Sequence, residues 1–114
     1  KRSDIPSVMK CFDVFALTSI YEGFGLVLLE ALAAEVPIVA SRVSAIPEVL
    51  DEGRCGLLFE SQNSEDLAEQ ILKLRDQELR KKLICNGSHR IESFFTREKM
   101  VLATDAIYKI CLLI

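Results

Sequence analysis

Residues 13–30 read DVFALTSIYEGFGLVLLE and join two apolar runs through a glycine-containing turn. The first run, residues 13–17, is short and carries aromatic and β-branched side chains, which favours a buried strand of a parallel sheet. Gly23 and Gly25 then interrupt the pattern, and every residue in 26–35 except two glutamates is apolar. That second run predicts a helix that is buried on most sides. The stretch therefore predicts a strand, a turn and a helix in succession.

The rest of the chain repeats this alternation of short apolar runs and helical patterns. Residues 37–40 and 56–59 predict two further strands. Asp4 as an N-cap, with Pro6 in the first turn, predicts a short helix at residues 5–11. A second short helix is predicted at residues 46–50, and apolar stripes predict helices at 64–75, 79–94 and 96–114. Such alternation indicates a parallel sheet, and three strands are fewer than the roughly six of a complete doubly wound domain. We therefore predict an α/β fold: half of a doubly wound, Rossmann-like parallel sheet with three strands and flanking helices, whose innermost strand lacks a neighbour.

Two of the predicted helices have defined faces. Ser64, followed by Glu65 and Asp66, is predicted to cap an amphipathic helix. One face of that helix carries Leu67, Ala68, Ile71, Leu72 and Arg75. The next helix has an apolar stripe made of Leu79, Leu83, Gly87, Ile91 and Phe94.

Length and composition limit the possible functions. The chain has 114 residues, of which 50% are apolar and 27% charged, so it is one small folded domain at most. Its formal net charge is −3, whereas proteins that bind nucleic-acid backbones are expected to be basic. The apolar run 110–114 is far shorter than the ~20 residues that span a bilayer, and no signal peptide opens the chain. We expect a cytoplasmic protein without a nucleic-acid partner, cut from a longer chain because it lacks an initiator Met; peripheral placement of that longer protein on a membrane stays open.

The cysteines and the histidine do not form a metal-binding pattern. The four cysteines are widely separated, at Cys11, Cys55, Cys85 and Cys111, and no two of them form a CxxC pair. A zinc site needs clustered ligands, so we expect no metal site. Cys11, Cys55 and Cys111 have apolar sequence neighbours and are expected to act as small hydrophobic residues in a reduced protein. His89 falls in a polar helical stretch and is expected to be a solvated surface residue.

The turn after the first strand is the candidate binding site. It leaves the carboxyl end of a parallel strand, which is where open α/β sheets bind ligands. Gly23 and Gly25 leave room for a ligand near the backbone, and the following helix offers free N–H groups at its start, which suits a phosphate or diphosphate. Glu30 lies inside an apolar helix, so it either binds donors such as the hydroxyls of a ribose or lies on an exposed stripe, paired with a Lys. Glu22 has the same solvated alternative.

The spacing from Glu22 to Glu30 resembles the Glu-x7-Glu motif of retaining GT-B glycosyltransferases of the group 1 (family 4) class. Residues 13–19 resemble the strand before that motif, and residues 30–40 resemble the passage into the next strand. Ile46-Pro47-Glu48 and Gly56-Leu57-Leu58 are similar to later signatures of the family. The resemblance therefore covers nearly the whole chain.

This resemblance implies a role for each residue of the motif. Glu22 is the implied catalytic residue, which contacts hydroxyls of the donor sugar and orients its anomeric carbon. Glu30 binds the ribose of the nucleotide. The implied backbone contacts to the donor sugar and its diphosphate come from Gly23, Phe24, Gly25 and Leu26. The family retains the anomeric configuration, with the departing phosphate taking the proton of the acceptor, and the resemblance implies no metal or other cofactor.

The chain departs from the family at two positions. Glu35 stands where the family usually has Gly, so the turn is expected to avoid a left-handed helix cap. Ser44-Ala45 replaces the usual Gly-Gly, which weakens any close backbone contact between that loop and the donor. The basic residues that bind the diphosphate from an earlier loop have no counterpart in the chain.

We therefore expect residues 1–114 to be the C-terminal half of a nucleotide-sugar-binding domain. The longer enzyme is expected to move a hexosyl group from a nucleotide-diphosphate sugar to a glycan, lipid or saccharide acceptor, while the isolated chain is inactive. Its expected partners are the nucleotide sugar, an N-terminal acceptor domain, and other copies of the chain through the sheet edge or the last helix. The helix 96–114 either crosses to the N-terminal domain or packs on its own core. A non-catalytic nucleotide-sugar-binding or assembly module, a GT-B nucleotide-sugar epimerase and a plain structural interaction domain are the alternatives.

Overall fold

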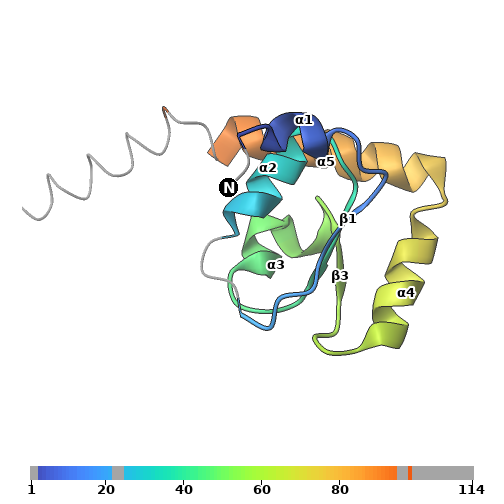
Figure 1. Cartoon of the computed structure of the whole chain (residues 1–114). Coiled ribbons are helices and arrows are strands. Elements are labelled where there is room, and N and C mark those ends of the chain that lie inside the picture. The colour runs from blue at the N-terminus through green and yellow to red at the C-terminus, as the bar shows by residue number, and fades with distance from the viewer. Residues whose placement is uncertain (1–2, 22–24, 95–97, 99–114) are drawn as a thin grey trace, which may run out of the picture.

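The computed structural model describes residues 3–21, 25–94 and 98, and places three parallel strands between helices (Figure 1). The strands are β1 (Phe15–Leu17), β2 (Ile38–Ser41) and β3 (Leu57–Phe59), in the spatial order β1-β2-β3. The helices are α1 (Ile5–Met9), α2 (Leu26–Ala33), α3 (Ile46–Val49), α4 (Ser64–Lys73) and α5 (Gln77–Phe94), with a 3₁₀ turn η1 (Asp51–Gly53). The predicted helix 96–114 lies outside the described residues, except for Glu98.

The register of the sheet explains how its residues divide between two faces. Phe15 pairs with Ile38 and Leu17 with Ala40, and β2 pairs with β3 in the same parallel sense. Side chains alternate along a strand, so neighbouring residues of β2 point to opposite faces. Ile38 and Ala40 join one core cluster, and Val39 joins the other.

Helices cover both faces of the sheet, with α2 and α3 on one side and α4 on the other (Figure 1). On the first side the core holds Leu28 and Leu32 of α2 together with Ile46 of α3, all nearly inaccessible to water. On the second side Phe59 packs with Leu74 and Leu83, and α4 contacts β2 and β3. This arrangement confirms the predicted α/β fold with three parallel strands and flanking helices.

Helix α5 packs against α2 through a glycine. Gly87 is buried, and a Cβ atom at this position would lie 2.8 Å from Cδ2 of Leu32. Leu83 is also buried, Leu79 and Ile91 are half-buried, and Phe94 is 60% exposed. The predicted stripe is therefore confirmed except at Phe94, which lies at the end of the helix.

The start and the buried face of α4 differ from the prediction. Asn63, not Ser64, is the N-cap: its side-chain oxygen accepts a hydrogen bond from the Asp66 N–H at 3.0 Å. Of the predicted face, Leu67 packs on the core, while Ile71 and Leu72 are 37% and 54% exposed. Leu74, just beyond the helix, is buried in their place. The predicted buried face was wrong at Ile71 and Leu72. Periodicity identifies an apolar stripe on a helix, but it does not show how much of that stripe the rest of the protein covers.

The turn after α2 also differs from the prediction, because Glu35 adopts the left-handed conformation with φ of 60°. The Glu35 N–H donates to the Leu32 carbonyl at 3.1 Å, and the Val36 N–H donates to the Ala31 carbonyl at 3.1 Å. These two bonds form a Schellman motif, which usually has Gly at this position. The helix therefore keeps the geometry that we expected the glutamate to prevent.

The cysteines follow the prediction only in part. Cys55 is buried in the core, as expected for a small hydrophobic residue. Cys11 is exposed, since it lies in the turn after α1 with its Sγ 3.5 Å from the Ser7 carbonyl oxygen. Cys111 lies outside the described residues.

Candidate donor-binding edge

The carboxyl ends of the strands meet at one edge of the sheet, and a hydrogen bond joins two of them. Ser41 ends β2 and is 1% exposed. Its hydroxyl donates to the carbonyl oxygen of Ser19, two residues beyond β1, at 2.6 Å. The segment that leaves β1 is therefore tied to the middle strand of the sheet.

Gly25 brings the chain from this edge into α2. It is the N-cap residue, with φ of 74° and ψ of 47°, a left-handed conformation that glycine adopts without strain. Its carbonyl accepts the Leu28 N–H at 2.9 Å, which closes the first turn. Leu26 follows at the start of the helix and is 62% exposed. The helix thus begins at the carboxyl edge of the sheet, after the glycine-containing turn that the sequence predicts.

Glu30 lies one turn further along α2 and is exposed. It lines a surface pocket of about 310 Å³ together with Ala33, Ala34, Pro6 of α1 and Lys10, which follows that helix. Glu30 therefore lies on an exposed stripe, and Lys10 lines the same pocket. An exposed carboxylate near the start of α2 is also accessible to a ligand.

The remaining predicted residues of the site, Glu22, Gly23 and Phe24, lie outside the described residues. The structure therefore places three of the predicted residues: Gly25 at the N-cap of α2, and Leu26 and Glu30 within the helix.

The carboxyl end of β3 is held by a carboxylate of α4. The Glu60 N–H donates to Oδ2 of Asp66 at 2.6 Å, and the amide of Gln70 donates to the other oxygen at 3.1 Å. These hydrogen bonds, that from Glu60 first, stabilise the ionised carboxylate and lower the pKa of Asp66. The start of the loop after β3 is therefore fixed to α4.

Sequence reasoning missed two residues of this edge, Ser41 and Arg42. Arg42 follows β2 and contacts Oε2 of Glu52 at 3.4 Å, with both side chains more than half exposed. Two residues later Ser44 has φ of 50°, a conformation that favours the glycine usual in the resembled family. The sequence offered a signal for these residues, because ligands bind at the carboxyl ends of parallel strands, and that rule applies to the residues after β2 as it does to the turn after β1.

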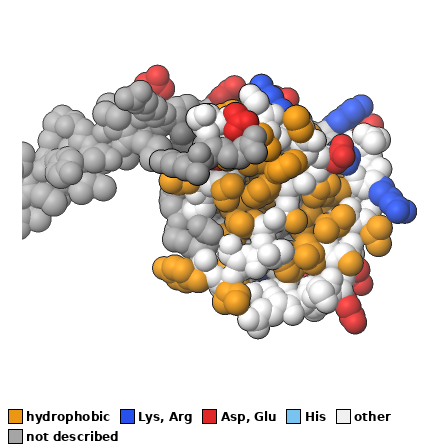
Figure 2. Space-filling view, in the orientation of Figure 1, with side chains coloured by type: hydrophobic (Ala, Val, Ile, Leu, Met, Phe, Trp, Pro, Cys, Tyr) orange, Lys and Arg blue, Asp and Glu red, His pale blue; other side chains and the backbone are white. Residues whose placement is uncertain are grey.

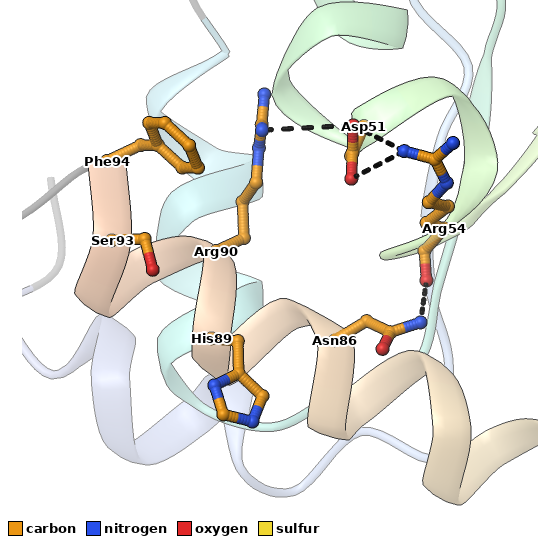
Figure 3. Close-up of a pocket in the computed structure, with 7 residues that line it drawn as sticks. All are labelled: Asp51, Arg54, Asn86, His89, Arg90, Ser93 and Phe94. Carbon is orange, nitrogen blue, oxygen red and sulfur yellow. Dashed lines mark hydrogen bonds and ion pairs between the residues drawn. The ribbon is translucent and has the colours of Figure 1, made fainter.

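A second pocket, of about 210 Å³, lies away from this edge, next to the segment that precedes β3 (Figure 3). It is lined by Asp51, Arg54, Asn86, His89, Arg90, Ser93 and Phe94. Figure 3 shows Asp51 between two arginines, with contacts of 3.4 Å to Arg54 and 3.8 Å to Arg90. His89 is exposed, as predicted.

Arg90 connects α5 to the end of α3. One guanidinium nitrogen donates to the Glu48 carbonyl at 2.6 Å, and the group stacks over the Phe94 ring at 4.7 Å. Asp51 and Glu52 both have positive φ, and Arg90 contacts the first of them. The arginine therefore holds a left-handed turn against α5, which is a structural role.

Burial raises the pKa of the nearby Cys55 thiol, and the carboxylate of Asp51 raises it further. Arg90 and Arg54 act in the opposite direction. The dominant effect is desolvation, which disfavours the thiolate.

Neither a metal site nor a membrane span is present within the described ranges. No three His, Cys, Asp or Glu side chains among these residues lie together in a way that could hold a metal ion. None of the described helices is both long and apolar enough to cross a bilayer.

A parallel sheet with helices on both faces and a helix that begins at its carboxyl edge defines an α/β unit of the Rossmann-like class. Residues 1–90 match the family model of glycosyl transferases group 1. The chain therefore belongs to this family of glycosyltransferases, and its fold is that of the GT-B members.

Comparisons with individual proteins agree with this membership. The chain is 35% identical over 109 residues to N-acetyl-alpha-D-glucosaminyl L-malate synthase of Bacillus anthracis, covering 95% of the chain and 29% of that protein. It superposes on Anabaena Alr3699/HepE, solved in complex with UDP, with a TM-score of 0.81 and 27% identity, covering 99% of the chain and 31% of HepE. The chain thus spans about three tenths of the length of these relatives.

A third comparison concerns a single domain. The C-terminal domain of the group 1 glycosyl transferase LpcC from Francisella tularensis superposes with a TM-score of 0.75 and 31% identity. The match covers 85% of the chain and 50% of the LpcC domain. The described unit is therefore similar to half of that domain.

Proposed function

We propose that the chain is the C-terminal half of the donor-binding domain of a longer retaining glycosyltransferase. In this proposal the longer protein is cytoplasmic and moves a hexosyl group from a nucleotide-diphosphate sugar to an acceptor. The observation that carries it is the turn into α2: in a group 1 family member, Gly25 opens a helix at the carboxyl edge of a parallel sheet, between the glutamates at 22 and 30.

Exposure along β1 supports the half-domain part of the proposal. β1 is an edge strand, and Ala16 at its centre is exposed while Phe15 and Leu17 are half-buried. Figure 2 shows hydrophobic side chains gathered across the face on which β1 lies. A complete domain would not leave a parallel strand uncovered, because parallel sheets are normally buried on both faces. We infer that the other half of the domain pairs with β1 and covers Ala16.

The proposed chemistry assigns the donor to the start of α2. Backbone N–H groups around Gly23, Phe24, Gly25 and Leu26 hold the sugar and its diphosphate, where the positive end of the helix dipole favours negative charge. Glu22 contacts sugar hydroxyls and orients the anomeric carbon, and Glu30 accepts hydrogen bonds from the ribose hydroxyls.

The acceptor hydroxyl attacks from the face that the phosphate leaves. The bond from the anomeric carbon to the phosphate oxygen breaks, the bond to the acceptor oxygen forms, and the departing phosphate takes the acceptor proton. Stabilisation of this leaving group is the largest contribution expected from the helix N-terminus. The configuration at the anomeric carbon is retained.

Binding and turnover by the full-length protein test this function. UDP is the first probe and UDP-glucose the second, because HepE was solved with each of them. We expect Glu22→Gln to lower kcat about 100-fold, and Glu30→Gln to raise KM for UDP-glucose about tenfold with little change in kcat. Glu69→Gln, which changes an exposed glutamate of α4, is the matched control.

The other outcomes separate the alternatives. Binding of UDP without sugar transfer would indicate a non-catalytic nucleotide-sugar-binding module, and an epimerised sugar nucleotide would indicate an epimerase. If no nucleotide diphosphate binds to the full-length protein, a structural interaction domain replaces the proposal. The 114-residue chain alone is expected to show no transfer.

A further inference from the structure

A polar pocket lies between α5 and the segment that precedes β3 (Figure 3). Asn86, Arg90 and Ser93 of α5 line it, and their i, i+4, i+7 spacing places them on one face of the helix. A helix face that packs on a core carries small or apolar residues at such a spacing, as Leu83 and Gly87 do on the buried side of α5. The polar face of α5 therefore supplies hydrogen-bonding groups to the pocket.

The charged side chains that line this pocket do not balance. Arg54 and Arg90 contribute two positive charges and Asp51 one negative charge, in a chain whose formal net charge is −3. Asp51 lies between the two guanidinium groups, 3.4 Å from Arg54 and 3.8 Å from Arg90. Charge-assisted hydrogen bonds are usually about 2.7–2.9 Å long, so a single carboxylate holds both arginines only weakly. A further anion would balance the second positive charge.

One of the two arginines is fixed and the other is exposed. The Arg90 side chain is 17% exposed, donates to the Glu48 carbonyl at 2.6 Å and stacks over the Phe94 ring at 4.7 Å. The Arg54 side chain is 74% exposed. A guanidinium group that the fold already holds in place loses little side-chain entropy when a ligand binds, and an exposed one can turn toward the ligand. Both groups match the geometry of phosphate oxygens.

We propose that this pocket binds a phosphate group between Arg54 and Arg90, apart from the donor-binding edge. A phosphate group carries a charge of about −1.5 to −2 at neutral pH and three strong acceptor oxygens, so it can contact both guanidinium groups at once. The pocket volume of about 210 Å³ is below the roughly 300–1,000 Å³ of pockets for drug-sized ligands. The ligand is therefore small, either inorganic phosphate or the phosphate of a small ester. This site does not rest on the proposed function.

A purely structural ion-pair cluster and a phosphate site make opposite predictions for Asp51. In a structural cluster, loss of the carboxylate lowers the melting temperature and creates no binding site. In a phosphate site, the same loss removes a like charge that repels the ligand, so phosphate binds more tightly. Asn is the suitable replacement, because Asp51 has φ of 51° and Asn adopts this left-handed conformation more readily than most residues.

Isothermal titration calorimetry of the full-length protein with inorganic phosphate and glycerol 3-phosphate is the test, with sodium chloride at the same ionic strength as the reference. We expect a Kd for inorganic phosphate of about 1 mM. Arg54→Gln should weaken binding about tenfold, because it removes one of the two charged donors, whereas Asp51→Asn should strengthen binding about fivefold. Arg42→Gln is the matched control. Arg42 is also exposed and lies 3.4 Å from an acidic residue, Glu52, but it is not among the pocket residues.

The outcomes separate this pocket from other places where phosphate could bind. If Arg42→Gln weakens binding as much as Arg54→Gln, phosphate binds at the donor-binding edge and the proposal is overturned. If Asp51→Asn leaves the affinity unchanged or lowers it, the cluster is a structural ion pair and the proposal is likewise overturned. A wild-type Kd above about 10 mM for both probes also overturns it.

The two probes distinguish the source of the phosphate group. Tighter binding of glycerol 3-phosphate assigns the pocket to phosphate esters, and tighter binding of inorganic phosphate assigns it to the free ion. The turnover of UDP-glucose tests the proposed function separately, so either proposal can fail while the other stands.

Discussion

Gly87 of α5 meets Leu32 of α2 so closely that a single added methyl group would lie 2.8 Å from the leucine Cδ2. Both residues are buried, and α2 is the helix that begins at the candidate donor-binding edge. The position of that helix therefore depends on a glycine more than 50 residues away along the chain.

Gly87→Ala is expected to destabilise the protein by about 1–3 kcal/mol, because the added methyl overpacks the contact and displaces the buried side chain of Leu32. On helix propensity alone the same change would stabilise the protein by about 1 kcal/mol. The sign of the measured change therefore shows whether the contact with Leu32 or helix propensity dominates. Urea unfolding of the 114-residue chain measures it. Leu32→Val, combined with Gly87→Ala, should recover part of the loss, and additive effects in this pair would contradict the contact.

Glu35→Gly is expected to stabilise the chain by about 0.5–1 kcal/mol, since Gly adopts φ of 60° without the cost that a side chain incurs. Thermal unfolding followed by circular dichroism is the measurement. Ala33→Gly, inside the same helix, is the control and should destabilise by about 1 kcal/mol. A destabilising Glu35→Gly would show that the glutamate side chain contributes more than the backbone strain costs.

Arg90→Met is expected to destabilise by about 2 kcal/mol, because it removes a charged donor from the Glu48 carbonyl and from Asp51. The side chain of Arg90 is 17% exposed, whereas that of Arg54 is 74% exposed. Arg54→Met should therefore cost less than about 1 kcal/mol. Equal losses in the two variants, measured by urea unfolding, would mean that Arg90 does not connect α5 to the turn at Asp51.

The free energy of unfolding is expected to fall as pH rises above about 9, the ordinary pKa of a cysteine thiol. Burial raises the pKa of Cys55 in the folded state, so above this pH the unfolded thiol has lost its proton while the folded one keeps it. The contribution of the buried Cys55 thiol to stability is fully present below the pKa of the unfolded thiol. It is lost as the pH rises from there through the pKa of the folded thiol. Cys55→Val should flatten the slope, and Cys85→Ala, at an exposed site, should leave it in place.

The sequence predicts that the 114-residue chain self-associates through its sheet edge or its last helix, and the structure adds an exposed apolar surface on α4. Ile71 and Leu72 of α4 contribute to this surface, as they are 37% and 54% exposed. Leu72→Glu should reduce the associated fraction in sedimentation velocity without lowering the melting temperature, and Glu69→Gln is the control. A monodisperse wild-type monomer would contradict the expectation.

The strands and most helices were predictable because their signals are local. A buried parallel strand is recognised as a short apolar run, as at residues 37–40, while α2 follows a longer apolar run and α5 an apolar stripe. The turn at Gly25 was predictable for the same reason, since glycine marks a left-handed residue wherever the chain requires one. At Glu35 this local rule failed, because two backbone hydrogen bonds of the helix end impose the conformation on a residue that disfavours it.

The amino-acid sequence by itself determined the order of strands and helices, the parallel sheet and the residues that open α2. Each of these depends on the periodicity of side chains within about 20 residues, which local sterics and burial decide. The tertiary structure alone decided which surfaces are covered and which distant groups meet: Ser41 with Ser19, Gly87 with Leu32, and Arg90 with Glu48. Such pairs follow from packing in three dimensions, where residues 22 to 55 positions apart compete for the same space and the same hydrogen-bonding groups.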